Sequence, residues 1–273
     1  CDHSDSMGAR DSGWIQMYAE NNQEAYDNMV QAFRISEHKD VRLPIMICQD
    51  GFITSHAVEN IELLEDAEVK GFVGEYEPEN YLLNPECPMA VGPYSVTDFY
   101  MEAKRNQAEG MKHVEKVVLD VAKEFAEMSG REYGLFEAYK LEDADRAVVM
   151  IGSAAGTTKD AIDKLRAQGE KVGLLKIRLY RPFPAEAIAE ALKNVKAVAV
   201  MDRAEGYTNH GGPLGSDVMA AMFRARSTAL ATNIIYGLGG RDVRVEDMEQ
   251  VFADLQTMID NDNAGETYRY MGI

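Results

Sequence analysis

The chain has 273 residues, 46% of them apolar and 27% charged, a composition typical of a globular protein with one large domain or two ordinary ones. The net charge of −18 argues against nucleic-acid binding and attraction to anionic lipid, and no apolar run approaches the roughly 18 residues that span a bilayer. Cys1, Cys48 and Cys87 lack C-x-x-C spacing, which argues against an iron–sulfur or zinc site in this chain and for a reducing cytoplasm.

The first part of the chain predicts two helices around one strand. Apolar residues near helical spacing predict a helix over 14–38, and an apolar run predicts a buried strand from Leu43 to Cys48. The strand ends in a polar turn in which Gly51 is expected to supply a positive φ. A second helix is expected to begin near Ser55 and to run through AVENIELL.

The stretch 69–96 has no steady period and holds four of the eight prolines, so it predicts a long irregular connection. Connections of this length are uncommon in compact proteins and are often functional. The residues that follow predict a long amphipathic helix over about 97–129, with Gly130 as its C-terminal cap.

The second half alternates near-continuous apolar strands with amphipathic helices. This pattern predicts a parallel α/β sheet covered by helices on both faces, with a domain boundary near 140–146. The predicted strands and helices alternate over 146–153, 157–169, 172–183, 185–194, 195–204, 212–225, 232–240 and 243–261.

Two polar stretches follow strands of this predicted sheet. GSAAGTTK, residues 152–159, opens a helix at the place where α/β sheets bind phosphate. Its spacing matches neither common glycine motif, and Thr157 or Thr158 as a plain helix N-cap explains it well, which is the interpretation we favour. In RLYRPFP, residues 178–184, Arg181 either faces an anion or a partner, or belongs to a rigid exit turn set by the prolines.

Two further stretches carry histidines. The glycine-rich residues 202–217 include His210 and form either a loop over a partner or a catalytic loop. In DGFITSH, Ser55 and His56 suggest a nucleophile and a base, although adjacent residues rarely face each other and no G-x-S-x-G elbow is present. The alternative is that Thr54 or Ser55 caps the following helix.

The opening stretch DHSDSMGARDSGW is the densest in polar groups. Asp2, His3 and Asp5 could bind a metal or orient a cofactor. An H-x-D pattern alone is a weak signal, and Asp11 or Ser12 could simply cap the helix expected next.

Several segments, taken in order, resemble one family. They are DHSDSMGARDSGW, LPIMICQDGFITSHAVE, YLLNPECPMAVGPY and AVVMIGSAAGTTKDAIDKLRAQGEKVGLLKIRLYRPFP. They look like the α subunit of pyruvate:ferredoxin oxidoreductase and, more broadly, the 2-oxoacid:ferredoxin oxidoreductase family. Residues 146–256 also resemble the C-terminal domain of transketolase-like enzymes.

The resemblance implies an α/β protein of two parts. Residues 1–140 are expected to form the C-terminal part of a pyrimidine-type thiamine-binding domain, and residues 141–273 a transketolase C-terminal-like domain. The implied enzyme decarboxylates a 2-oxoacid, with pyruvate as the first expectation, on thiamine diphosphate with Mg²⁺. It forms an acyl-CoA from CoA and passes electrons through iron–sulfur clusters to ferredoxin.

The resemblance also implies partners and a cytoplasmic location. Beta, gamma and delta-type subunits are expected, with the diphosphate–Mg²⁺ motif and the cluster cysteines on other chains or domains. Family members carry a further N-terminal segment that holds their principal catalytic residues. The chain is therefore expected to be incomplete, with those residues upstream of Cys1, and inactive alone.

The residues that remain are expected to support the thiamine site. We hypothesise that the loop Asp2–Arg10 and the turn Asp50–His56 lie near this site and position neighbours by hydrogen bonds, and that residues 69–100 wrap a partner subunit. The supporting candidates are Asp2, His3, Asp5, Arg10, Asp50, Ser55 and His56.

Two other functions fit parts of the sequence. The first is a non-catalytic scaffolding or assembly subunit of such a complex. The second is a transketolase-like transferase or dehydrogenase component, which only the second half supports. The choice of 2-oxoacid is not readable from these residues.

Overall fold

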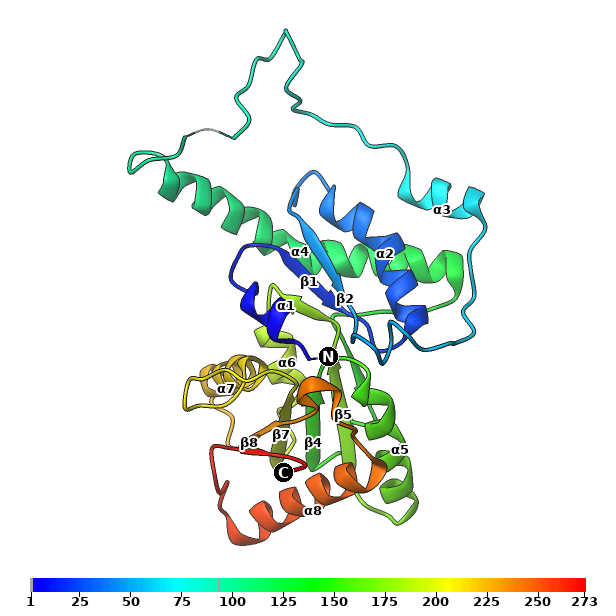
Figure 1. The fold of residues 1–273 in the computed structure, drawn as a ribbon, viewed down its shortest axis with the longest axis vertical. Helices are drawn as coiled ribbons and strands as arrows, with labels where there is room; N and C mark the ends of the chain where they lie inside the picture. Colours follow the sequence, from blue (N-terminus) through cyan, green and yellow to red (C-terminus); the bar gives the residue numbers. More distant parts are fainter. Residues whose placement is uncertain (1, 93) are drawn as a thin grey trace.

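Two β-sheets organise the chain in the computed structural model, which describes residues 2–92 and 94–273 (Figure 1). Expectations that involve Cys1 and Pro93 lie outside the described residues. The first sheet has the order β2-β1-β6, with β2 parallel and β6 antiparallel to the central strand. Its strands are β1 (Ile15–Tyr18), β2 (Ile45–Cys48) and β6 (Leu179–Arg181). The helices of this part are α1 (Ser4–Gly8), α2 (Asn22–Ser36), α3 (Asp66–Val73) and α4 (Tyr100–Ser129).

The second sheet has six strands in the order β3-β5-β4-β7-β8-β9, parallel except for the antiparallel edge strand β3. Its strands are β3 (Phe136–Tyr139), β4 (Arg146–Met150), β5 (Val172–Ile177), β7 (Ala197–Asp202), β8 (Leu230–Ile235) and β9 (Tyr268–Tyr270). Its helices are α5 (Ala154–Ala167), α6 (Ala185–Ala191), α7 (Pro213–Arg224) and α8 (Val245–Asn261), with a short 3-10 turn at Leu238–Gly240.

Side chains of this second sheet alternate between two apolar layers, because successive strand residues point to opposite faces. Val149 packs in the layer under α6 and α7, whereas Val148 and Met150 pack in the layer under α5 and α8. The predicted parallel sheet with helices on both faces is therefore confirmed.

The two sheets exchange strands across the expected boundary near 140–146. Strand β3, which precedes the boundary, pairs with β5 in the second sheet. The stretch 172–183, predicted as one strand, is divided into β5 and β6, and β6 pairs with β1 in the first sheet. The division at 140–146 stays a prediction, and the backbone ladders link the two parts.

The helix predicted over 14–38 is wrong at its beginning. Residues 15–18 form β1, all four of them buried, and α2 begins only at Asn22. The side chain of Asn21 accepts a hydrogen bond from the Glu24 N–H, which fixes the start of α2 three residues beyond the strand. A short, fully buried strand and a buried helical turn are both runs of mainly apolar residues. The spacing of apolar residues therefore does not distinguish one from the other.

The helix expected from Ser55 is also wrong. Residues 57–65 have no regular structure, and α3 begins after Glu65, which forms a capping box with Glu68. Strand β2 is confirmed within the predicted Leu43–Cys48, but its residues are only half-buried.

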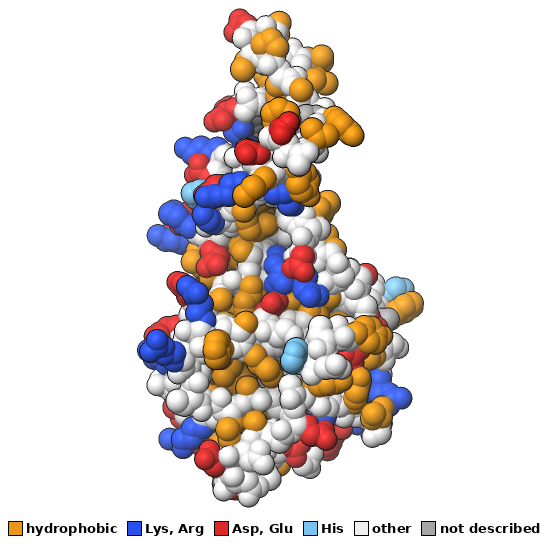
Figure 2. Space-filling view, turned by 90° about the vertical axis from the view of Figure 1, so that its left-hand side faces the viewer, with side chains coloured by type: hydrophobic (Ala, Val, Ile, Leu, Met, Phe, Trp, Pro, Cys, Tyr) orange, Lys and Arg blue, Asp and Glu red, His pale blue; other side chains and the backbone are white. Residues whose placement is uncertain are grey.

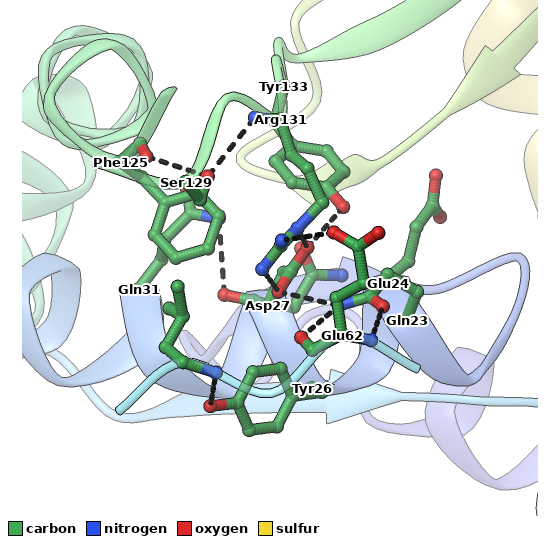
Figure 3. Close-up of polar contacts among 12 residues, drawn as sticks. Gln23, Glu24, Tyr26, Asp27, Gln31, Glu62, Phe125, Ser129, Arg131 and Tyr133 are labelled. Atoms are coloured by element: carbon green, nitrogen blue, oxygen red, sulfur yellow. Dashed lines mark hydrogen bonds and ion pairs between the residues drawn. The ribbon is translucent and has the colours of Figure 1, made fainter. Parts of the chain in front are cut away.

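Residues 59–64 lie instead along α2, held by reciprocal hydrogen bonds (Figure 3). The Gln23 side chain donates to the Glu62 carbonyl at 3.2 Å and accepts from the Glu62 N–H at 2.6 Å. Beside them, the fully buried Asp27 accepts two hydrogen bonds from Arg131 and one from Tyr133. This network joins α2 to the turn that follows α4.

The long helix is confirmed as α4, which ends at Gly130 with φ of 72°. Its second half carries the buried residues, from Val114 to Phe125. The irregular connection predicted over 69–96 is wrong for residues 69–73, which belong to α3, and is confirmed over the described residues from 74 to 96. Residues 74–92 and 94–99, which extend far from both sheets in Figure 1, are called the arm. Within the described residues, no helix has both the length and the apolar character to cross a membrane.

Candidate functional site

A cavity of about 750 Å³ lies where strands β1 and β2 end. The carboxyl ends of parallel strands are the usual place for a binding site in an α/β layer. Helix α1 forms one wall, and the turn after β2 forms the other. The residues that line the cavity are Asp2, His3, Ser4, Asp5, Ser6, Ala9, Tyr18, Met46, Ile47, Cys48, Gln49, Gly51 and Phe52.

Beneath this cavity lies a buried carboxylate, that of Asp50, which is 3% exposed. His3 Nε2 lies 2.5 Å from one of its oxygens, and Arg203 Nη1 donates to the other at 2.8 Å. The backbone N–H and the hydroxyl of Ser153 donate to the same carboxylate. Burial alone would raise the pKa of Asp50, but the His3 and Ser153 contacts hold it well below its usual range. The carboxylate is therefore ionised at neutral pH.

We call these four residues, His3, Asp50, Ser153 and Arg203, the carboxylate hub. They come from both parts of the chain: Asp50 follows β2, Ser153 follows β4 and Arg203 follows β7. The hub therefore joins the carboxyl ends of the two sheets. Gly152 has φ of 83°, and a Cβ there would lie 2.8 Å from an Asp50 carboxylate oxygen, so only glycine lets this backbone approach the Asp50 side chain so closely.

Sequence reasoning missed two members of the hub. It singled out the stretches that contain Ser153 and Arg203, but it gave neither residue a role. The available signal was their shared position directly after predicted strands, because the carboxyl ends of neighbouring parallel strands meet at one edge. Which distant side chain they bind depends on how the two sheets pack.

The structure brings together four of the seven predicted candidates. Asp2, His3 and Asp5 line the cavity, and Asp50 holds His3 from below. Arg10 lies apart from them. It lines a separate cavity of about 590 Å³ together with residues of α4 and the turn after β6.

Ser55 and His56 are exposed and lie outside the cavity lining. The expectation that these neighbours do not face each other is wrong, because Ser55 Oγ lies 2.8 Å from His56 Nδ1. The predicted N-cap role of Thr54 or Ser55 is also wrong, since no helix begins there. The His56 ring stacks on Phe52, a cavity-lining residue, with centroids 4.6 Å apart. Phe52, and not Gly51, has the positive φ of this turn.

Other predicted caps are corrected as well. Asp11 and Ser12 cap no helix, because β1 follows them. Helix α5 begins at Ala154, so Thr157 and Thr158 lie inside it. The Thr158 hydroxyl donates back to the carbonyl of Ala154, which satisfies it within the helix.

In the glycine-rich stretch 202–217, the carboxylate of Asp202 binds the N-terminus of α7, which belongs to the same stretch. Asp202, at the end of β7, accepts hydrogen bonds from the N–H groups of Leu214 and Gly215 at the beginning of α7. Asn233 donates to the same carboxylate at 2.9 Å. This helix N-terminus, which could bind an anion, already holds a carboxylate. His210 is exposed and lies outside the cavity lining.

Arg181 is bound within the chain. Its guanidinium lies 2.9 Å from Asp217 and donates to the carbonyl of Arg10 at 3.1 Å. It also stacks over the ring of Tyr180. These contacts fix the exit of β6 against α7 and against the loop after α1.

The cavity wall is acidic and aromatic. Its lining, among the described residues, includes two carboxylates and no Lys or Arg. The Tyr18 ring lies 5.4 Å from that of His3, and its hydroxyl donates to Ser6. Burial raises the pKa of the Cys48 thiol to about 12, so this cysteine is no thiolate nucleophile at neutral pH. The lining suits a neutral or cationic nitrogen heterocycle better than a phosphate group.

A second acidic cluster, Glu20, Glu24 and Glu137, lies between α2 and the edge of the second sheet. Lys176, 3% exposed, contacts all three carboxylates, and Lys159 contacts two of them. Burial alone would lower the pKa of Lys176, but the carboxylates raise it. Two ammonium groups already fill this cluster, so its residues do not fit a divalent cation.

Family models cover both parts of the chain. Residues 1–123 match the model described as pyruvate flavodoxin/ferredoxin oxidoreductase, thiamine diphosphate-binding. Residues 144–248 match the model of pyruvate:ferredoxin oxidoreductase core domain II.

Curated relatives align along nearly the whole chain. Pyruvate synthase subunit PorA of Thermotoga maritima is 45% identical over 100% of this chain and 69% of its own length. PorA of Methanocaldococcus jannaschii is 43% identical over 95% of this chain and 66% of its own length. The alpha subunit of NADH-dependent phenylglyoxylate dehydrogenase from Aromatoleum evansii is 35% identical over 94% of this chain and 64% of its own length. The chain thus spans about two thirds of the length of these relatives.

Among solved structures that share the fold is one of a much longer chain. The 2-oxoglutarate:ferredoxin oxidoreductase from Magnetococcus marinus, with 2-oxoglutarate, coenzyme A and succinyl-CoA bound, matches with a TM-score of 0.58 and 16% identity. The match covers 88% of this chain and 42% of that one. At this identity the likeness concerns the arrangement of strands and helices.

Proposed function

The chain belongs to the pyruvate:ferredoxin oxidoreductase family as a homologue of its α subunit, and from this premise we propose that it serves a multi-subunit enzyme that oxidatively decarboxylates a 2-oxoacid. With CoA as the second substrate, the products are an acyl-CoA, CO2 and two electrons that reduce ferredoxin. The observation that carries the proposal is the 45% identity to a pyruvate synthase subunit along the entire chain.

The described residues fit one end of thiamine diphosphate. When bound, this cofactor supplies the carbon nucleophile and electron sink for decarboxylation. The acidic and aromatic lining of the 750 Å³ cavity, with Asp2, Asp5 and Tyr18, suits the aminopyrimidine end. It offers no cation to a diphosphate, so we assign the diphosphate, its Mg²⁺ and the iron–sulfur clusters to other chains or segments.

We propose that His3 is the proton-handling residue of this wall and that Asp50 positions it. A carboxylate hydrogen-bonded to one ring nitrogen fixes the imidazole orientation and tautomer. Asp50 is itself held by Ser153 and Arg203, so His3 cannot rotate freely toward solvent. Asp2 and Asp5 act beside it as hydrogen-bond acceptors.

Pyruvate is the proposed substrate, because the two most similar relatives named above are pyruvate synthase subunits. Phenylglyoxylate, a larger 2-oxoacid, is the alternative that the Aromatoleum evansii relative supports. The ratio of kcat/KM for the two acids decides between them, since the added ring needs a larger pocket.

The test is CoA-dependent reduction of ferredoxin by pyruvate in the complex assembled with its cognate subunits. His3→Gln should lower kcat by about tenfold or more, as expected for lost proton transfer, with thiamine diphosphate still bound. Asp5→Ala should also lower kcat, because it removes a hydrogen-bond acceptor from the cavity wall. His56→Ala should lower it less, through loss of the stack on Phe52. Asp242→Asn, an exposed control on another surface, should leave kcat unchanged.

Two results would contradict the proposal. An assembled complex without 2-oxoacid oxidation would favour the scaffolding alternative. Wild-type rates in His3→Gln would remove the proposed role of the cavity wall and leave the family assignment intact.

A further inference from the structure

The arm, residues 74–92 and 94–99, has an unusual charge composition. It carries the carboxylates of Glu75, Glu77, Glu79, Glu86 and Asp98 and contains no Lys, Arg or His. Strongly acidic tracts without apolar side chains usually remain solvated. This tract differs, because large apolar residues alternate with its acids.

Those apolar side chains are exposed. Leu83 is 85% exposed, Tyr94 91% and Val91 66%. Figure 2 shows hydrophobic and acidic side chains at the upper tip of the molecule, where the arm reaches its greatest distance from the sheets before it turns back toward α4. Monomeric proteins rarely expose contiguous apolar surface of this kind, and where they do it commonly marks an interaction site.

The arm has few contacts with the rest of its own chain. In the described part of the molecule, one ion pair ties it to the body: Arg42 Nη2 lies 2.8 Å from Glu79 Oε2. Its internal hydrogen bonds are local, such as the Asn84 side chain accepting from the N–H groups of Glu86 and Cys87. A long segment that has neither regular structure nor a core of its own is expected to adopt a fixed conformation by packing against another surface.

The net charge of the chain indicates which surface the arm binds. A second copy of the chain carries a net charge of −18 and would repel an arm with five carboxylates. Building on the proposed multi-subunit enzyme, we infer that the arm docks as an extended strap in a groove of a different subunit. The groove has an apolar floor for side chains such as Leu83 and Tyr94 and a rim of Lys and Arg for the carboxylates.

The experiment measures assembly of the tagged chain with the cognate subunits of the oxidoreductase. Leu83→Asp puts a charge on the expected apolar contact, and the pair Glu75→Lys with Glu77→Lys reverses the rim charge. Neither change touches the folded core, so the isolated variants should unfold at the same urea concentration as the wild type. Phe223→Asp on α7, where the native side chain is 86% exposed, is the matched control.

We expect each arm variant to weaken the association by at least about tenfold, as for an interface anchor or a reversed charge cluster. Added salt should weaken the wild-type complex and affect the Lys variant less. Phe223→Asp should assemble normally.

If the wild-type complex forms and both arm variants assemble equally well, this inference is wrong, and the proposed function is unaffected. The inference is also wrong if the arm variants lose self-association, measured by analytical ultracentrifugation, while their assembly with the cognate subunits stays intact. The arm would then bind a second copy of the chain. If the wild-type chain assembles with no cognate subunit, the proposed function itself fails.

Discussion

At the scale of single residues, Asp50 matters most for how the molecule is joined. Its carboxylate is removed from water, which is costly unless charges and hydrogen bonds compensate. His3, Ser153 and Arg203 supply that compensation from three different segments. The sequence predicted polar groups at this strand end, but it could not predict that the charge of Asp50 is used internally.

Replacing Asp50 by Asn tests this balance. The Asp50→Asn variant leaves Arg203 buried without its carboxylate, and we expect a loss of about 3–5 kcal/mol of unfolding free energy at pH 7. Because the pKa of Asp50 is lowered on folding, its stabilisation is present above the ordinary carboxyl value and is lost as pH falls through the lower folded value. The gap between wild type and variant should therefore stay constant from pH 7 to 5 and narrow only below about pH 4.

Urea unfolding at pH 7, 5 and 3 measures that gap. The exposed control Asp242→Asn should stay within about 0.5 kcal/mol of the wild type throughout. A gap that already narrows between pH 7 and 5 would mean that another group, and not Asp50, is the one that titrates.

At the scale of elements, residues 59–64 lie along α2 through tertiary contacts, at a place where the sequence predicted a helix. In residues 59–64, backbone groups of Glu62 and Leu64 are satisfied by the side chains of Gln23 and Tyr26, where a helix would have satisfied them internally (Figure 3). The Leu64 N–H, for example, donates to the Tyr26 hydroxyl at 3.2 Å. A pattern of apolar residues cannot reveal such side-chain docking, because the partner is distant in sequence.

Gln23→Ala should release this segment without unfolding the protein. Both hydrogen bonds to Glu62 are lost, each worth about 1 kcal/mol, while the Asp27–Arg131 pair remains. We expect faster hydrogen exchange at residues 59–64 and little change elsewhere. Gln250→Ala on α8, which removes an exposed side-chain pair, is the control. Slow exchange at 59–64 in the variant would show that other contacts hold the segment.

Prediction from sequence succeeded where periodicity is long or repeated. Helix α4 and most of the alternating elements after Arg146 follow clear patterns, and these were placed correctly apart from their ends, whereas the edge strands β3 and β9 were not predicted. The failures at β1, at residues 55–65 and at β6 concern short segments whose state is decided by what packs on them. For the same reason the candidate list contained Asp50 and His3 but not Ser153 or Arg203.

At the scale of the whole molecule, the two sheets are interdependent. Strands β3 and β6 each pair in the sheet opposite to their position along the chain, and the carboxylate hub bridges the strand ends. Leu179 of β6 is packed in the same apolar cluster as Ile15 and Met17 of β1. Neither sheet can lose its structure without exposing part of the other.

We therefore expect one cooperative unfolding transition. Trp14, the single tryptophan, lies next to β1 and reports on the first sheet, whereas far-ultraviolet circular dichroism reports on the helices of both parts. Fluorescence and circular dichroism should give the same urea midpoint. A fluorescence transition that clearly precedes the other would show that the first sheet unfolds independently.

The pairing of β1 with β6 also bears on how the protein is made. On the ribosome, Ile15–Tyr18 emerges long before Leu179–Arg181, so one edge of a fully buried strand stays unpaired while most of the chain is still being translated. Such an edge invites association between nascent chains. The protein should accordingly depend on chaperones during slow synthesis more than after it has folded.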